Sequence, residues 1–216
     1  MTKNTLFTLI AFSLLSVGVQ AAPIIGLPPD GGTGNCFPFG CTGTRYQQVY
    51  SAAGFSGSIT ITDITFYNTT FTAGTIAPGT YTLHLSTTSA AVDALSSTFA
   101  SNVGANDALF AVYAGGGSAS PSFTIAGTGF TYDSTMGNLL LDIFVANSGS
   151  GTVYLDARNG TAGGIFSRMH DFGTGFEGFG LVTGFNEGGS VPEPGTYAMI
   201  VGGLLVLMAK QRRRKA

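Results

Sequence analysis

The sequence contains no tryptophan and few charged residues, since only 9% of its 216 residues are Asp, Glu, Lys or Arg. Between residues 22 and 190 there is no lysine, and three arginines stand against ten acidic residues, a net charge of −7. Such a surface cannot neutralise many phosphates, which argues against a nucleic-acid partner. Without tryptophan, a surface that stacks on sugars would have to use tyrosines, for which the candidates are Tyr46, Tyr50, Tyr113 and Tyr154.

Cysteine and histidine are equally scarce, with two of each. Cys36 and Cys41 bracket the segment FPFG, and in an exported chain this spacing favours a local disulfide, worth about 2 kcal/mol by chain entropy. Two free thiols are the alternative. A metal or redox site would need further ligands, and neither His84 nor His170 stands at ligand spacing from the pair. We therefore predict no metal and no cofactor.

Long apolar runs are confined to the two ends of the chain. The N-terminal end carries Lys3, an apolar stretch over 6–19, and small residues at Val19 and Ala21. This order is typical of a secretory signal peptide over 1–21, cleaved after Ala21. An N-terminal membrane anchor is the weaker alternative, because the apolar stretch is shorter than the ~20 residues that a spanning helix needs.

The C-terminal apolar run, 195–209, is fifteen residues long and forms about 22 Å of helix, whereas a hydrocarbon core is about 30 Å thick. It can hold in a membrane only with help from Lys210, whose long side chain reaches the interface. The tail over 210–215 is basic and should remain in the cytoplasm, leaving the preceding domain outside. Its charged residues are Lys210, Arg212, Arg213, Arg214 and Lys215.

The segment that precedes this run completes a known pattern. Val191, Pro192, Glu193 and Pro194, followed by a short apolar helix and an arginine-rich end, resemble the PEP-CTERM sorting signal of Gram-negative bacteria over 187–216. Gly195 and Tyr197 stand where that family often has serine and tryptophan. The resemblance implies an inner-membrane intermediate, processing near the motif by an exosortase-type enzyme, and release or attachment at the cell surface, usually beside exopolysaccharide and biofilm matrix. A plain single-span anchor with a proline-containing stalk is the alternative.

The part of the chain between these signals has the composition of an all-β domain, because it is rich in β-branched, aromatic and turn-forming residues. We predict a single jelly-roll-like β-sandwich over 45–186, preceded by a Gly/Pro-rich arm over 22–44 that is loose over 26–35. One short helix is expected at 90–100, where Val92, Leu95 and Phe99 can line one stripe. About nine strands are expected, at 45–52, 59–70, 79–88, 107–115, 122–133, 138–148, 152–158, 164–172 and 178–185.

Two of these strands show how the sheet should face the core. Tyr81, Leu83 and Leu85 alternate with polar residues, as in a strand with one wet side. The segment 138–148 is apolar on both faces, which predicts a central strand.

Four polar residues form the main candidate ligand face. Asp156 and Arg158 share one face of their strand, and so do Arg168 and His170. If the two strands are neighbours, the four side chains form one polar ladder. A structural salt-bridge network is the favoured interpretation, and sugar or matrix binding is the functional one.

Catalysis and calcium binding are weaker hypotheses. Two facing carboxylates would serve a glycosidase, and the candidates are Asp142, Asp156, Asp171 and Glu177. The oxygen-rich segment 29–35 resembles a calcium-bearing turn but lacks a spaced acidic series. The sequence therefore favours an exported, non-enzymatic surface or matrix protein associated with exopolysaccharide. The alternative is a secreted polysaccharide-active hydrolase or carbohydrate-binding module.

Overall fold

The structure is a computed structural model that describes residues 22–28, 34–147, 149–159, 164–171 and 177–187. These residues form strands joined by turns, with two 3-10 helices, η1 (Ala52–Gly54) and η2 (Phe99–Asn102). The strands are β1 (Ile24–Ile25), β2 (Gly34–Asn35), β3 (Arg45–Tyr50), β4 (Ser58–Tyr67), β5 (Thr80–Thr88), β6 (Ala108–Ala114), β7 (Ser122–Asp133), β8 (Asn138–Ala146), β9 (Leu155–Asn159), β10 (Phe166–His170), β11 (Phe179–Leu181) and β12 (Thr183–Phe185).

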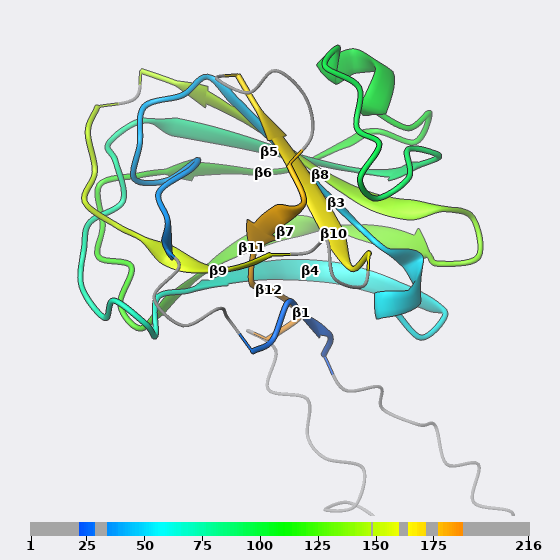
Figure 1. Ribbon diagram of the computed structural model, residues 1–216, viewed down its shortest axis with the longest axis horizontal. Coiled ribbons are helices and arrows are strands. Elements are labelled where there is room, and N and C mark those ends of the chain that lie inside the picture. The colour runs from blue at the N-terminus through cyan, green and yellow to red at the C-terminus, as the bar shows by residue number, and fades with distance from the viewer. Residues whose placement is uncertain (1–21, 29–33, 148, 160–163, 172–176, 188–216) are drawn as a thin grey trace, which may run out of the picture. The chain divides into compact units, whose positions relative to one another are not determined.

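Two antiparallel sheets face each other across the core (Figure 1). One has the strand order β10-β3-β8-β5-β6, and the other has the order β1-β12-β4-β7. A third sheet, β11-β9-β2, connects one side of this pair, since β11 contacts β10 and β9 contacts β4. The prediction of an all-β sandwich is confirmed.

Side-chain alternation places the core as the sequence indicates. Tyr81, Leu83 and Leu85 of β5 are fully buried between the sheets. Strand β8 is central, because it pairs with β3 on one side and β5 on the other. Its inward row is buried, while Phe144 on its outer face is 38% exposed.

The segment over 22–44 belongs to the sandwich, in contrast to the separate arm that we predicted. Phe39 is fully buried and packs against the rings of Phe66, Tyr81 and Phe123. Strand β1 pairs with β12 and β2 pairs with β9, so two stretches of the segment join sheets. Half of the predicted loose stretch over 26–35, namely 29–33, lies outside the described residues.

The helix predicted over 90–100 is wrong. Residues 90–98 are irregular apart from a turn at 92–93 and a bend at 97–98, and Asp93 has a left-handed backbone with a φ of 63°. The Asn102 side chain accepts a hydrogen bond from Ser96 N at 2.7 Å and donates to Ser96 O at 2.9 Å, holding the segment as a loop. The apolar stripe packs on the sheet without a helix, with Leu95 buried beside Val49 and Leu140 and with Val92 and Phe99 against that cluster.

Both ends of the described domain lie at one sheet edge. Strand β1 begins two residues after Ala22, and its partner β12 ends two residues before Glu187. Asn186 secures the second end at an irregularity in the β4–β7 pairing. Its backbone N donates to Asp63 O at 3.0 Å, its Oδ1 accepts from Thr62 N at 2.7 Å, and its Nδ2 donates to Thr60 O at 2.8 Å.

Candidate functional site

The four residues predicted as one ligand face lie in two separate places. Strand β9 holds Asp156 and Arg158 and pairs with β2 and β11, whereas β10 holds Arg168 and His170 and pairs with β3. Because β9 and β10 are not hydrogen-bonded neighbours, the predicted four-residue ladder does not form. Each pair has its own partners.

Asp156 is a structural acceptor beneath a loop. Its side chain accepts hydrogen bonds from the backbone N of Thr69 and of Thr70, each at 2.9 Å, and from the Thr69 hydroxyl. Burial alone would raise the pKa of Asp156, but these hydrogen bonds to the ionised form outweigh it and hold the pKa below its usual value. The carboxylate therefore fixes the loop to β9.

Arg168 and His170 meet at one carboxylate, Glu177. The Arg168 guanidinium lies 2.6 Å from Glu177 Oε2, and His170 Nε2 lies 3.3 Å from Oε1. Arg168 also packs over the Phe179 ring at 4.5 Å, and His170 stacks on Phe37 with ring centroids 4.6 Å apart. This cluster ties β10 to the start of β11 and to the disulfide loop.

Electrostatics in this cluster follow from burial and from the guanidinium. Burial lowers the pKa of His170, Arg168 lowers it further, and Glu177 offsets this only in part. For Glu177 burial raises the pKa, but Arg168 and His170 bring it below its usual value. At neutral pH the cluster therefore holds a neutral imidazole, a carboxylate and a guanidinium.

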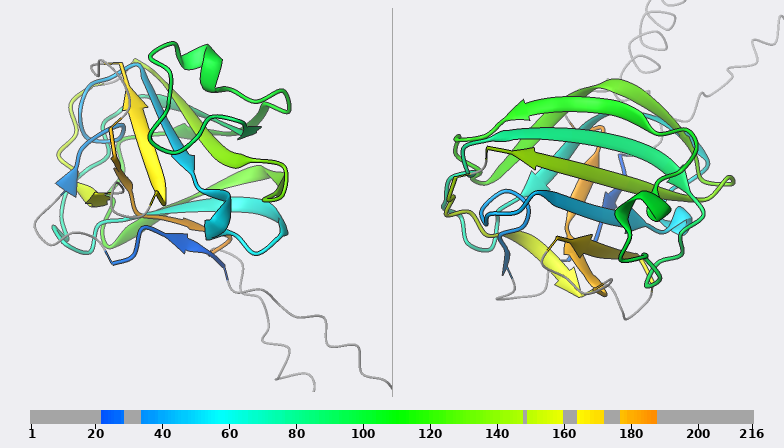
Figure 2. Two further views of the ribbon diagram at one scale, coloured as in Figure 1. Left: turned by 45° about the vertical axis from the view of Figure 1, so that its right-hand side comes forward. Right: turned by 90° about the horizontal axis from the view of Figure 1, so that it is seen from above.

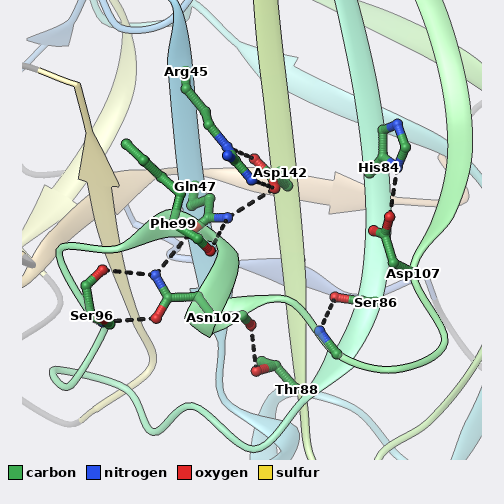
Figure 3. A network of polar contacts seen from close by, with 11 residues as sticks. Arg45, Gln47, His84, Ser86, Thr88, Ser96, Phe99, Asn102, Asp107 and Asp142 are labelled. Carbon is green, nitrogen blue, oxygen red and sulfur yellow. Dashed lines mark hydrogen bonds and ion pairs between the residues drawn. The ribbon is translucent and has the colours of Figure 1, made fainter.

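The outer face of the five-stranded sheet carries a polar network that the sequence analysis missed. Asp142 of β8 is buried and accepts from Arg45 Nε at 3.0 Å, Arg45 Nη2 at 2.7 Å and Gln47 Nε2 at 2.8 Å. Asn102 donates to Gln47 Oε1 at 2.9 Å and so links this network to the loop that covers it. Figure 3 shows these side chains pointing toward one another, and Figure 2 shows the loop with η2 lying over the sheet.

A signal for this network was present in the sequence. Asp142 stands within the apolar run LLLDIFV, and a carboxylate buried in a central strand needs a charged partner. The strand register supplies that partner, because Gln47 pairs directly with Asp142 and Arg45 lies on the same face two residues along β3. Nothing in the local sequence shows which strand will be the neighbour.

The cysteines form the disulfide that their spacing favours. Phe39 lies within the loop that this disulfide closes, and its ring belongs to the core. The disulfide therefore holds this loop against the sandwich. Among the described residues there is no group of three His, Cys, Asp or Glu side chains placed to hold a metal ion. The segment 29–35, considered above for its likeness to a calcium-bearing turn, falls mainly on residues outside the described ranges.

The four carboxylates considered for catalysis all have structural partners. Asp142 and Asp156 are bound as described above, and Glu177 faces Arg168. Asp171 accepts from Thr44 N at 2.6 Å and from the Thr44 hydroxyl at 2.8 Å. A glycosidase acid needs a raised pKa, yet the pKa values of Asp156 and Glu177 are both lowered.

The proposed sugar-stacking tyrosines differ in exposure. Tyr46 and Tyr50 are fully buried, so the expectation that their rings stack on a sugar is wrong. Tyr113 is half-buried against Tyr81 and Phe123. Tyr154 is 48% exposed and packs against exposed Phe71, so it is the one of the four that remains available.

The sorting motif at 191–194, the apolar run at 195–209, the basic tail at 210–215 and the leader at 1–21 lie outside the described residues. Within the described ranges, no helix has the length and hydropathy needed to span a membrane.

The fold and its clusters define an all-β sandwich with partly buried ion pairs and one disulfide. Comparison with known proteins finds no matching family model, no matching curated protein and no matching solved structure.

Proposed function

We propose that this chain is an exported, non-enzymatic protein of the cell surface or extracellular matrix, delivered by a PEP-CTERM sorting signal and associated with exopolysaccharide. The observation that carries the proposal is the fit of one folded unit between two targeting segments. A compact unit covers Ala22–Gly189. Signal-peptide cleavage is expected directly before Ala22, and the sorting motif begins at Val191.

The placement of the domain ends supports this topology. Because β1 and β12 pair, the start and the end of the folded domain lie at the same sheet edge. From Glu187 to Pro192 the chain spans five residues, at most about 18 Å when extended. The prolines at 192 and 194 favour extended backbone before them, which suits a peptide offered to a processing enzyme close to the membrane.

The partners in this proposal are an exosortase-type processing enzyme, the inner membrane as a transient site, and exopolysaccharide. A nucleic-acid partner is not proposed, since the part of the chain over 22–190 carries a net charge of −7. A non-enzymatic role is supported by the carboxylates, whose oxygen atoms are taken up by structural contacts with Arg45, Thr69 and Arg168.

The test is the intact mass of the protein in each fraction of its producing cells. We expect a surface or medium species that begins at Ala22 and ends near Pro194. Replacing Pro192, Glu193 and Pro194 together by alanine should leave the uncut chain in the inner membrane. The matched control replaces Gly188 and Gly189 by alanine in the same linker and should be processed normally. A wild-type chain that keeps its whole tail in the inner membrane would contradict the proposal and support a plain anchor.

A further inference from the structure

A cavity of about 320 Å³ lies beside β1, next to η1, to the last residues of β9 and to the residues directly before β10. This volume falls at the lower end of the range for small-ligand sites, and it is large enough for one sugar ring. The lining residues are Ile24, Ile25, Gly26, Leu27, Ser51, Ala53, Gly54, Arg158, Gly164 and Ile165.

Arg158 is the one charged residue among the described residues that line this cavity. Its Nη1 donates to Leu27 O at 2.7 Å, which fixes the guanidinium at the cavity wall. The other two arginines of the domain are bound to acids, Arg45 to Asp142 and Arg168 to Glu177. Within the described ranges Arg158 forms no such ion pair. Since a guanidinium has five N–H donors, most of its donors remain available to a ligand.

The lining defines the chemistry of that ligand. A single guanidinium without a lysine nearby matches one carboxylate, which it can hold in a two-pronged contact. Aliphatic side chains such as Ile24 and Ile165 offer surface to C–H groups, while the hydroxyl of the lining residue Ser51 can bond to sugar hydroxyls. A pyranose ring that carries a carboxylate has all three features.

We propose that this cavity binds a uronic acid residue of an anionic polysaccharide, with Arg158 holding the sugar carboxylate. The inference deepens the proposed function by naming the class of polysaccharide and the site that recognises it. Arg158 is the binding residue, and the aliphatic and glycine walls set the size of the sugar that fits.

A second cavity provides an internal comparison. It measures about 310 Å³ and is lined by Thr87, Ala105, Asn106, Thr131, Asp133 and Met136. The two cavities are alike in size, but this one carries a carboxylate where the first carries a guanidinium. A uronate should therefore enter the first cavity and be repelled from the second.

The experiment measures binding of trigalacturonate and of neutral maltotriose to the full chain in detergent at low salt by calorimetry. We expect trigalacturonate to bind and maltotriose to bind at least tenfold more weakly. Arg158→Gln, which keeps a donor for Leu27 O, should weaken trigalacturonate binding at least about tenfold, and Arg158→Lys should keep part of it. Ala53→Phe should block the cavity, because Ala53 is an exposed lining residue.

The matched control is Ala105→Phe, which puts the same bulk at an exposed position of the second cavity and should leave binding unchanged. Thermal unfolding of each variant shows that it is folded. Equal binding of both sugars, or full binding by Arg158→Gln, would overturn the inference. Because the assay does not depend on sorting, the proposed function is tested separately by the mass of the exported chain.

Discussion

At the scale of single residues, a buried amide shows how a polar side chain can be satisfied inside the domain. Gln48 is fully buried, yet its Nε2 donates to Leu181 O at 2.9 Å and its Oε1 accepts from Leu181 N at 2.8 Å. The side-chain amide thereby replaces a strand pairing between β3 and β11. Buried amides satisfied in this way avoid the penalty of about 1–3 kcal/mol for an unpaired polar group.

Asp142 gives the sharpest prediction at this scale. Replacing it by alanine should lower the free energy of unfolding by about 3 kcal/mol, because Arg45 and Gln47 lose their acceptor beneath the covering loop. The matched control is Asp107→Ala, at the residue directly before β6 of the same sheet. Asp107 is exposed and pairs with His84 at 3.0 Å, so its loss should cost less than about 1 kcal/mol. Denaturant unfolding measures both, and equal losses would contradict the assignment.

His170 predicts how stability depends on pH. Its pKa is lowered in the folded state, so the unfolded chain takes up a proton at higher pH than the folded chain does. The contribution is complete above the ordinary histidine value of 6.5 and is lost as pH falls from there toward the lowered pKa. Melting temperature should therefore fall on acidification below about pH 6.5, and less steeply in His170→Gln.

Glu177 and Asp156 add a second loss of folding stability as pH falls. Both have lowered pKa values in the folded state, so their contributions are present above the ordinary carboxyl range and are lost at lower pH as they protonate. A wild-type melting temperature that rises between pH 6.5 and pH 5 would contradict the histidine assignment.

At the scale of elements, hydrophobic alternation was enough to place the longer strands. Strand β7 has the range predicted for it, and β8 is central because both of its faces are apolar. The two-residue strands β1 and β2 were missed, since two residues carry no period and their pairing depends on segments more than a hundred positions away. The helix over 90–100 failed because hydrogen bonds to Asn102 made the loop more stable than a helix.

The candidate site was harder to predict than the fold, because its contacts also depend on how segments pair that the local sequence does not connect. Arg168 and His170 were recognised as a pair, but their common partner Glu177 was considered only as a possible catalytic carboxylate. Its bridge to Arg168 forms outside regular strand pairing. Arg158 was grouped with Arg168 on the condition that their strands are neighbours, and only the topology shows that they are not.

Asn186 gives a prediction for the end of the last element. Its φ of 64° suits glycine or asparagine, and its side chain bonds to Thr60 and Thr62 of β4. Asn186→Gly keeps the backbone conformation and should cost about 1–2 kcal/mol for the lost hydrogen bonds. Asn186→Ala adds backbone strain and should cost more. Equal stability of Asn186→Ala and wild type in denaturant unfolding would refute this clamp.

At the scale of the whole molecule, the proposed function places one β-sandwich between two expected export signals. The proposed export leaves outside the cell a domain with a net charge of −7 and no lysine, a charge that disfavours binding to nucleic acids. The arginine-rich end has the opposite charge and is expected to remain in the cytoplasm. The distribution of charge along the chain therefore predicts its orientation in the membrane.

This orientation is the central claim, and a reporter fused after Ala216 tests it most directly. Alkaline phosphatase is active only outside the inner membrane, and a fluorescent protein that folds only in the cytoplasm is its complement. The account predicts a fluorescent, phosphatase-inactive C-terminus, and the same reporters placed after Gly189 should give the reverse pattern. Phosphatase activity from the fusion after Ala216 would contradict the account.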